Sequence, residues 1–257
     1  MNKVMMAAAA IAVAVLSGCR TANECTCYCG MCKCVKTMPV CTPQEIAEGF
    51  VPLFNGVDFE GWDVSTNGSY VVEPGGVLAY RHELGGSMWT KKNYRDFNLR
   101  FEFRLSCDCN NGLGVRVPKG MNTYNGGFEL QIIDDEGSMY KGVFPQLGVP
   151  QHAYQRHGAV YGVVPPKVQK NGRSYLKRVG EWNTQEVEMH GSRLKVWLNG
   201  TLIQDCDLDD YPIDGTSMDH AKHPGIRSRE GRFGWLSHGY PCWWRNIRIK
   251  EFKEGDR

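Results

Sequence analysis

Residues 193–203 read RLKVWLNGTLI, and this stretch decides the fold class of the chain. Asn199-Gly200 is a strong signal for a two-residue hairpin turn, so the residues on either side of it are predicted to pair as antiparallel strands. The same reasoning predicts strand, turn and strand over residues 70–80, around Pro74-Gly75-Gly76.

Further strands follow in both directions from this hairpin. Residues 98–105 and 184–190 alternate polar and apolar side chains, which predicts strands with one buried face. One short helix is predicted over residues 43–49. The other predicted strands are residues 112–117, 128–133, 232–236 and 244–252. Many strands, regular turns and almost no helix predict an all-β fold, a two-sheet antiparallel β-sandwich.

The N-terminus carries the signals of an exported lipoprotein. Lys3 gives a short positive region, and residues 5–16 form an apolar run that is too short to span a bilayer. Leu16-Ser17-Gly18-Cys19 then places small residues before a cysteine. We expect lipidation of Cys19 and a stable anchor of several acyl chains. An ordinary secretory signal with a chance cysteine is the alternative.

These signals divide the chain into three predicted parts. Residues 1–18 are a lipoprotein signal peptide, residues 19–50 a lipidated, Cys-rich tether, and residues 51–253 the sandwich domain. Arg20 is not an obvious signal for retention at the inner membrane. The expected location is therefore the cell envelope, anchored by lipid at the outer membrane, on its periplasmic or surface face.

Cysteine usage suits an oxidising compartment. The chain has 11 cysteines, and an even number remains if Cys19 is lipidated. A disulfide knot is favoured over a metal site in the tether, because no second, well-separated C-x-x-C follows the first. The tether cysteines are Cys25, Cys27, Cys29, Cys32, Cys34 and Cys41. Cys107 and Cys109 could pair with each other, or with Cys206 or Cys242.

Composition narrows the classes of ligand. The net charge is +2 and the charges are interspersed, so nothing points to nucleic acid. Thirty Gly, 11 Tyr and 7 Trp favour a turn-rich β protein with an aromatic-lined surface. No Gly-rich phosphate loop and no nucleophile elbow are found in the sequence.

Strand periodicity selects a polar face. Glu129 and Gln131 lie on the face of their strand opposite to the apolar set that should pack in the core. By the same rule Arg116 shares a face with Gly112 and Gly114, and these glycines leave space for a ligand. An ion pair between Glu129 and Arg116, bridging neighbouring strands, is the structural alternative.

A series of short motifs, in order along residues 51–252, resembles those of one family. They are Phe54-Asn55-Gly56 with Gly61-Trp62, Tyr94–Leu99 with Glu102-Phe103-Arg104, Asn111–Arg116, Phe128–Asp134, Gly158–Tyr161, Glu181-Trp182-Asn183, Trp197–Gly200 and Arg245–Ile249. The set resembles the 3-keto-disaccharide hydrolase domain. This resemblance implies a jelly-roll sandwich of the concanavalin A-like lectin/glucanase type, and cleavage of glycosides already oxidised at C3.

The implied reaction differs from that of common glycosidases, whose transition states resemble oxocarbenium ions. A 3-keto group acidifies the C2 proton, so a base can form an enolate, the C1 substituent leaves by β-elimination, and water adds back. The reaction needs a general base, an electrophile for the enolate oxygen and an acid for the leaving oxygen. A divalent metal ion could be that electrophile.

The resemblance suggests roles for individual residues. Glu129 is the expected base or metal ligand, and Arg116 the cation near the keto or enolate oxygen. His238 and Gly239 match the end of the family's "LQ-D-HG" motif, so His238 is a candidate acid, base or metal ligand. Leu236 and Ser237 replace the polar pair of that motif. The side chains expected to bind substrate are Gln131, Asn111, Tyr161, Lys91, Trp89 and His157.

Two segments have both functional and structural interpretations. His157 lies with Tyr161 in a loop that could close over a sugar, or it is an exposed loop histidine. His220 and His223, near Asp219, have near-ligand spacing, but they lie in a loop with Gly and Pro, which argues against a metal site.

The predicted function is that of a carbohydrate-active enzyme that cleaves 3-keto-glycosides or 3-keto-disaccharides. Its partners would be the oxidised sugar, the membrane through the lipid anchor, and a separate glycoside 3-oxidoreductase that supplies the keto group. The alternative is a non-catalytic glycan-binding lipoprotein of the envelope.

Overall fold

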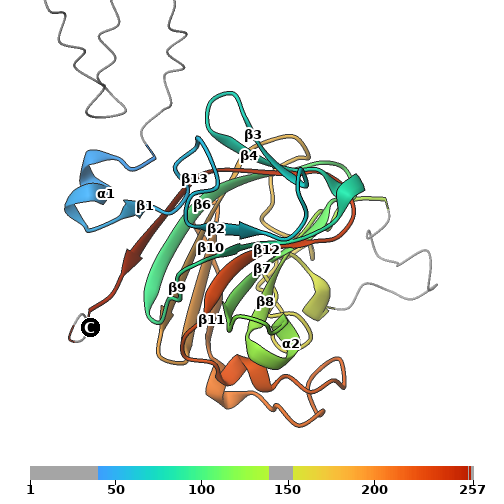
Figure 1. Ribbon diagram of the computed structural model, residues 1–257. Helices are drawn as coiled ribbons and strands as arrows, with labels where there is room; N and C mark the ends of the chain where they lie inside the picture. Colours follow the sequence, from blue (N-terminus) through green and yellow to red (C-terminus); the bar gives the residue numbers. More distant parts are fainter. Residues whose placement is uncertain (1–39, 139–152, 254, 256–257) are drawn as a thin grey trace, which may run out of the picture.

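The computed structural model describes residues 40–138, 153–253 and 255 as an all-β fold (Figure 1). The predicted signal peptide, Cys19 and the five cysteines at positions 25–34 lie outside the described residues. No helix within the described ranges is long and apolar enough to cross a membrane.

Two antiparallel sheets form a sandwich of the predicted jelly-roll type (Figure 1). The large sheet has eight strands in the order β11-β10-β9-β6-β13-β4-β3, with β1 paired to β13. Its strands are β1 (Val51–Pro52), β3 (Tyr70–Glu73), β4 (Val77–Tyr80), β6 (Phe97–Leu105), β9 (Asn183–His190), β10 (Arg193–Leu198), β11 (Thr201–Asp207) and β13 (Cys242–Glu251).

The small sheet has five strands in the order β2-β5-β12-β7-β8. They are β2 (Trp62–Val64), β5 (Met88–Thr90), β7 (Asn110–Val117), β8 (Phe128–Ile133) and β12 (Arg232–Ser237). The helices are short: α1 (Pro43–Ala47), α2 (Thr123–Gly126) and the 3-10 turns η1 (His82–Leu84), η2 (Ala153–Gln155), η3 (Leu208–Asp210) and η4 (Pro224–Arg227). The two antiparallel sheets, joined by only short helices, confirm the predicted all-β fold class.

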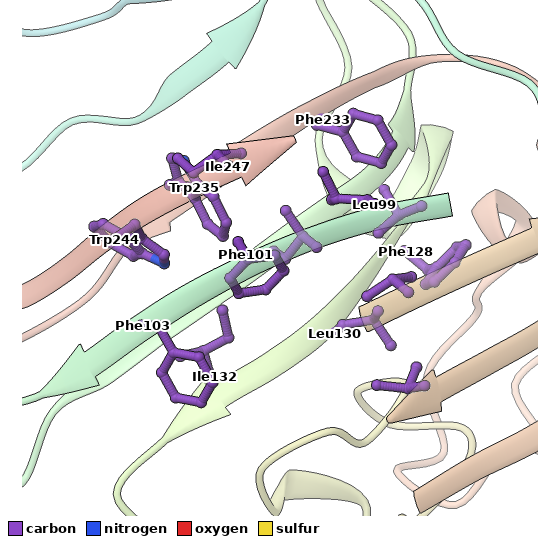
Figure 2. Packing of buried hydrophobic residues seen from close by; sticks show 14 of the residues in the cluster. Leu99, Phe101, Phe103, Phe128, Leu130, Ile132, Phe233, Trp235, Trp244 and Ile247 are labelled. Carbon is purple, nitrogen blue, oxygen red and sulfur yellow. The ribbon is translucent and has the colours of Figure 1, made fainter. Parts of the chain in front are cut away.

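The core lies between the inner faces of the two sheets (Figure 2). Alternate residues of β6, namely Phe97, Leu99, Phe101 and Phe103, are buried, as the alternation of polar and apolar residues predicts. From the small sheet, Trp235 stacks on Trp244 of the large sheet with ring centroids 4.7 Å apart. Apolar residues of β7, β8 and β12 face inward, so their alternate residues form the outer face of the small sheet.

The hairpins predicted from turn residues are confirmed. Asn199 and Gly200 both have positive φ, at 50° and 80°, which a type I′ turn requires. The second strand of this hairpin continues to Asp207, beyond its predicted end at Ile203.

The helix α1 belongs to the folded unit, although it precedes the predicted start of the domain. A capping box between Thr42 and Glu45 begins it. Glu45 also bonds the guanidinium groups of Arg100 and Arg248 on the large sheet. The folded unit therefore begins a few residues before residue 51, where the domain boundary was predicted.

Of the pairings left open for the sandwich cysteines, the structure brings Cys109 and Cys242 together. Both are fully buried free thiols, and burial together with the neighbouring Cys109 thiol raises the pKa of Cys242 well above its usual value. Ser106, three residues before Cys109, donates to the carbonyl of Pro241, the residue before Cys242, through its amide (3.2 Å) and its hydroxyl (2.8 Å), which holds the two segments side by side.

Candidate functional site

One cross-strand row on the outer face of the small sheet organises the site. Trp89 of β5 pairs with Gly234 of β12, Gly234 pairs with Gly114 of β7, and Gly114 pairs with Glu129 of β8. Side chains in register across a sheet share one face. The row therefore has an indole at one end, a carboxylate at the other, and two glycines between them.

The indole of Trp89 lies across the two glycines. A Cβ atom would come within 2.7 Å of the Trp89 ring at Gly114 and within 2.1 Å at Gly234. Any other residue at either position would lift or displace the ring. Trp89 Nε1 donates to Ser87 Oγ (2.8 Å), and the Arg232 guanidinium lies 5.3 Å from the ring centroid. The ring is thus a supported, half-exposed platform next to the carboxylate.

Glu129 leans over the neighbouring glycine of β7. A Cβ atom on Gly112 would lie 2.1 Å from Glu129 Oε1. With its amide nitrogen oriented toward Glu129, Gln131 donates to Oε1 (3.2 Å) and to the carbonyl of Asn111 (2.7 Å). Burial raises the pKa of Glu129 from 4.5 to about 7. A carboxyl group poised near neutrality in a cleft is a candidate general base.

The Glu129 cleft is small and open to solvent, and it is lined by Thr123, Tyr124, Phe128, Glu129, Tyr161 and His223. Tyr161 is held against β8 because its amide donates to the carbonyl of Glu129 (3.0 Å). Thr123 also borders the Trp89 platform, since its methyl group and the indole ring both approach Gly114. The cleft and the platform therefore form one continuous site, with α2 along its edge.

A histidine–aspartate pair forms the far wall of the Glu129 cleft. His223 Nε2 lies 2.9 and 3.0 Å from the two carboxylate oxygens of Asp219, and its ring stacks on Tyr124 with centroids 5.6 Å apart. Gly162, at φ +78°, allows this approach, because a Cβ there would lie 2.2 Å from Asp219 Oδ2. Sequence reasoning disfavoured this loop as a site. Its only signal was the i, i+4 spacing of Asp219 and His223.

Arg116 does not join Glu129. Its positive φ of 53° breaks the alternation of β7, and the pairing of β7 with β12 shifts register at the same place. The side chain is fully buried and donates to the carbonyls of Arg95, Gly191 and Ser228 and to Asp96 Oδ1. The prediction that Arg116 faces the site is therefore wrong, and so is the alternative of an ion pair between Arg116 and Glu129. Both assumed that the alternation of β7 continues without a break at Arg116.

His157 and Asn111 are interior residues. The His157 ring stacks on Phe103 and is 1% exposed. The amide of Ile133 donates to Nδ1 (3.4 Å), so Nε2 donates to Gln185 Oε1 (3.1 Å). Burial lowers the pKa of His157 to about 4, against the bond to Gln185, which raises it. Asn111 is fully buried and accepts from the amide that follows it. Neither faces the Glu129 cleft.

His238 lies beyond the end of β12, away from Glu129 in register. Leu236 pairs with Gly112, so it lies one cross-strand row beyond the row that holds Gly234 and Glu129. His238 comes two residues after Leu236 and therefore lies one row further from Glu129. Within the described ranges, the one group of three or more clustered potential metal ligands is Cys107, Asp108 and Asp134, and neither Glu129 nor His238 belongs to it. Lys91 is exposed just after β5. Of the predicted residues, the structure unites Glu129, Gln131, Tyr161 and Trp89.

Comparisons with known proteins agree with this architecture. The sequence profile of the 3-keto-alpha-glucoside-1,2-lyase-like domain matches residues 49–250. A protein of Bacteroides thetaiotaomicron named 3-keto-disaccharide hydrolase is 21% identical over 79% of each chain. The crystal structure of a candidate glycosyl hydrolase from Parabacteroides distasonis is 27% identical with a TM-score of 0.68, covering 83% of this chain and 98% of that one. A second such structure from the same species is 24% identical with a TM-score of 0.66, covering 79% of this chain and 99% of that one.

Proposed function

Because the chain belongs to the 3-keto-alpha-glucoside-1,2-lyase-like domain family, we propose that it cleaves 3-keto-glycosides with Glu129 as the general base. The observation that carries this proposal is the row across the small sheet. A carboxyl group whose burial raises its pKa to about 7 shares that row with a glycine-supported indole.

The proposed reaction begins with the sugar ring on the Trp89 platform. Aromatic faces pack well against apolar surface while polar groups at their edge stay solvated, which suits a pyranose. Glu129 removes the C2 proton, and the electron pair moves to the C3 carbonyl to form an enolate. The carbonyl then re-forms, a C1–C2 double bond appears and the C1–O bond breaks. Addition of water to C1 and return of a proton to C2 complete a net hydrolysis.

The pKa of Glu129 fits this task. A base acts best when its pKa lies near the working pH, because it is then both ionised and strong enough to take the proton. Gln131 keeps the carboxylate oriented through its amide. We expect the rate to rise with pH through about 7, as Glu129 ionises.

Turnover of 3-keto-glucosides by the purified protein tests the proposal. Both anomers of 4-nitrophenyl 3-keto-glucoside would be supplied, with and without chelator, and released 4-nitrophenol measured. We expect turnover that Glu129→Gln lowers at least about 100-fold. The exposed Glu60→Gln is the matched control and should keep full activity. Full activity of Glu129→Gln would refute the assignment of the base.

One observation favours a second candidate function, glycan binding without catalysis. Leu236 lies in the row with Gly112 and Gln131, where the family motif has a polar residue. An apolar residue there suits sugar packing more than acid–base chemistry. Binding of intact oligosaccharides, measured by calorimetry, with no turnover of either 3-keto anomer would support this alternative.

The proposed location is the cell envelope, through lipidation of Cys19 and with a separate oxidoreductase supplying the 3-keto sugar. It is supported by the N-terminal sequence pattern alone. Incorporation of a labelled fatty acid into the full-length chain tests it. Equal labelling of Cys19→Ala and the unaltered chain would refute it.

A further inference from the structure

We propose that His223, held by Asp219, is the acid that protonates the leaving glycosidic oxygen. This inference rests on the proposed function and adds to it a residue that sequence reasoning did not assign to catalysis. It starts from the geometry of the histidine ring rather than from a motif.

The ring is held by one nitrogen only. Nε2 donates to the carboxylate of Asp219. Nδ1 makes no hydrogen bond with any part of the chain that the structure describes. Asp219 is itself fixed, because its Oδ1 accepts from the amide of Ala221 (2.9 Å) and the hydroxyl of Ser217 (3.0 Å). A carboxylate that holds one imidazole nitrogen leaves the other to exchange a proton with a substrate, as in hydrolase triads.

The position of the ring suits an acid that works with Glu129. His223 and Glu129 line the same small cleft, one from the loop before η4 and the other from β8. Elimination requires proton removal at C2 and proton delivery at the oxygen on C1, which are neighbouring positions of one ring. A single bound sugar could therefore contact both groups.

The proton balance is complete without another reactant. Protonated His223 gives its Nδ1 proton to the glycosidic oxygen as the C1–O bond breaks, and the ring becomes neutral. Neutral Nδ1 then takes a proton from the water that adds to C1, which restores the acid. Glu129 returns its proton to C2 in the same hydration step.

The tyrosines of the cleft are weaker candidates for this acid. Burial raises the pKa of Tyr124 above its usual value, which makes its hydroxyl a poorer proton donor. The Tyr161 hydroxyl accepts a hydrogen bond from Gln155 Nε2 (3.2 Å), and phenols as a class are far weaker acids than imidazolium ions. Both rings are better suited to contacting the sugar than to protonating its leaving group.

The dependence of the rate on the leaving group tests the role of His223. 4-Nitrophenolate leaves without protonation, whereas the alcohol released from a 3-keto-disaccharide needs an acid. We expect His223→Gln to lower kcat on the disaccharide about 100-fold or more and on the nitrophenyl substrate less than about tenfold. Asp219→Asn should show the same imbalance to a smaller extent. His220→Asn, in the same loop, is the matched control, because Asn tolerates the positive φ of 60° there.

The outcomes separate this inference from the proposed function. Equal loss on both substrates by His223→Gln, with an unchanged melting temperature, would assign His223 a structural role and overturn the inference alone. Failure of the unaltered protein to cleave either substrate would overturn the proposed function and the role of His223 together. Selective loss on the disaccharide supports both.

Discussion

The raised pKa of Glu129 makes a prediction about stability that needs no substrate. A carboxyl group whose pKa is higher in the folded than in the unfolded chain binds its proton more tightly when folded. Its stabilising contribution is complete below pH 4.5 and is lost as the pH rises to about 7. At pH 8 the folded protein therefore carries the full cost of an ionised Glu129, and Glu129→Gln removes that cost.

The size of the effect follows from the shift. A rise from 4.5 to about 7 corresponds to about 3 kcal/mol at roughly 1.4 kcal/mol for each pKa unit. The carboxylate borders an open cleft and accepts a bond from Gln131, so solvent and the amide both reduce the cost. We expect Glu129→Gln to raise the free energy of unfolding at pH 8 by about 1–2 kcal/mol, and to leave it nearly unchanged at pH 4.5.

Urea unfolding followed by Trp fluorescence measures this difference. The two proteins would be compared at pH 4.5 and pH 8, with the m value checked for equality so that midpoints report stability. Glu60→Gln is the control, because its side chain is exposed and should give no difference at either pH. A destabilised Glu129→Gln at pH 8, or a gain of equal size at both pH values, would refute the reasoning.

Three further predictions address the platform, the helix α1 and the buried cysteines. Trp89→Ala should raise KM for a 3-keto-disaccharide about fivefold, equivalent to about 1 kcal/mol of lost ring contact, and an unchanged KM would count against the platform. Burial raises the pKa of Glu45, but Arg248, Thr42 and Arg100 outweigh it and lower this pKa to about 2. Glu45→Gln should therefore cost about 3 kcal/mol of unfolding free energy at pH 7. The cost should become progressively smaller as the pH falls from about 5 toward 2. Thermal melts that show the same cost at every pH would contradict this. Refolding with oxidised glutathione should join Cys109 to Cys242 with release of two reduced glutathiones, and peptide mapping without reductant would reveal any other pairing.

Local patterns in the sequence were sufficient to predict the fold class. Strand alternation depends on neighbours two residues apart, and the Asn199-Gly200 turn depends on the backbone freedom of two adjacent residues. The same alternation correctly placed Glu129 and Gln131 together on the outer face of β8, because no irregularity interrupts that strand. These features needed no knowledge of the rest of the molecule.

Alternation failed where a strand is irregular. Arg116 adopts a left-handed backbone conformation, and its side chain enters a set of buried carbonyls instead of the site. His157 seemed to be a loop residue, yet it packs between Phe103 and Gln185 in the interior. A bulge or a loop that folds inward is set by contacts with distant segments, which local patterns do not contain.

The sequence by itself determined the sandwich, the polar face of β8 and the family resemblance, since each depends on short-range pattern. Only the tertiary structure decided which groups meet. Strand register put Trp89 and Glu129 in one row, and Gly162 let the loop of Asp219 and His223 close against the same cleft. These partners come from four separate segments of the chain, and only the packing of the sheets and loops brings them within reach of one sugar ring.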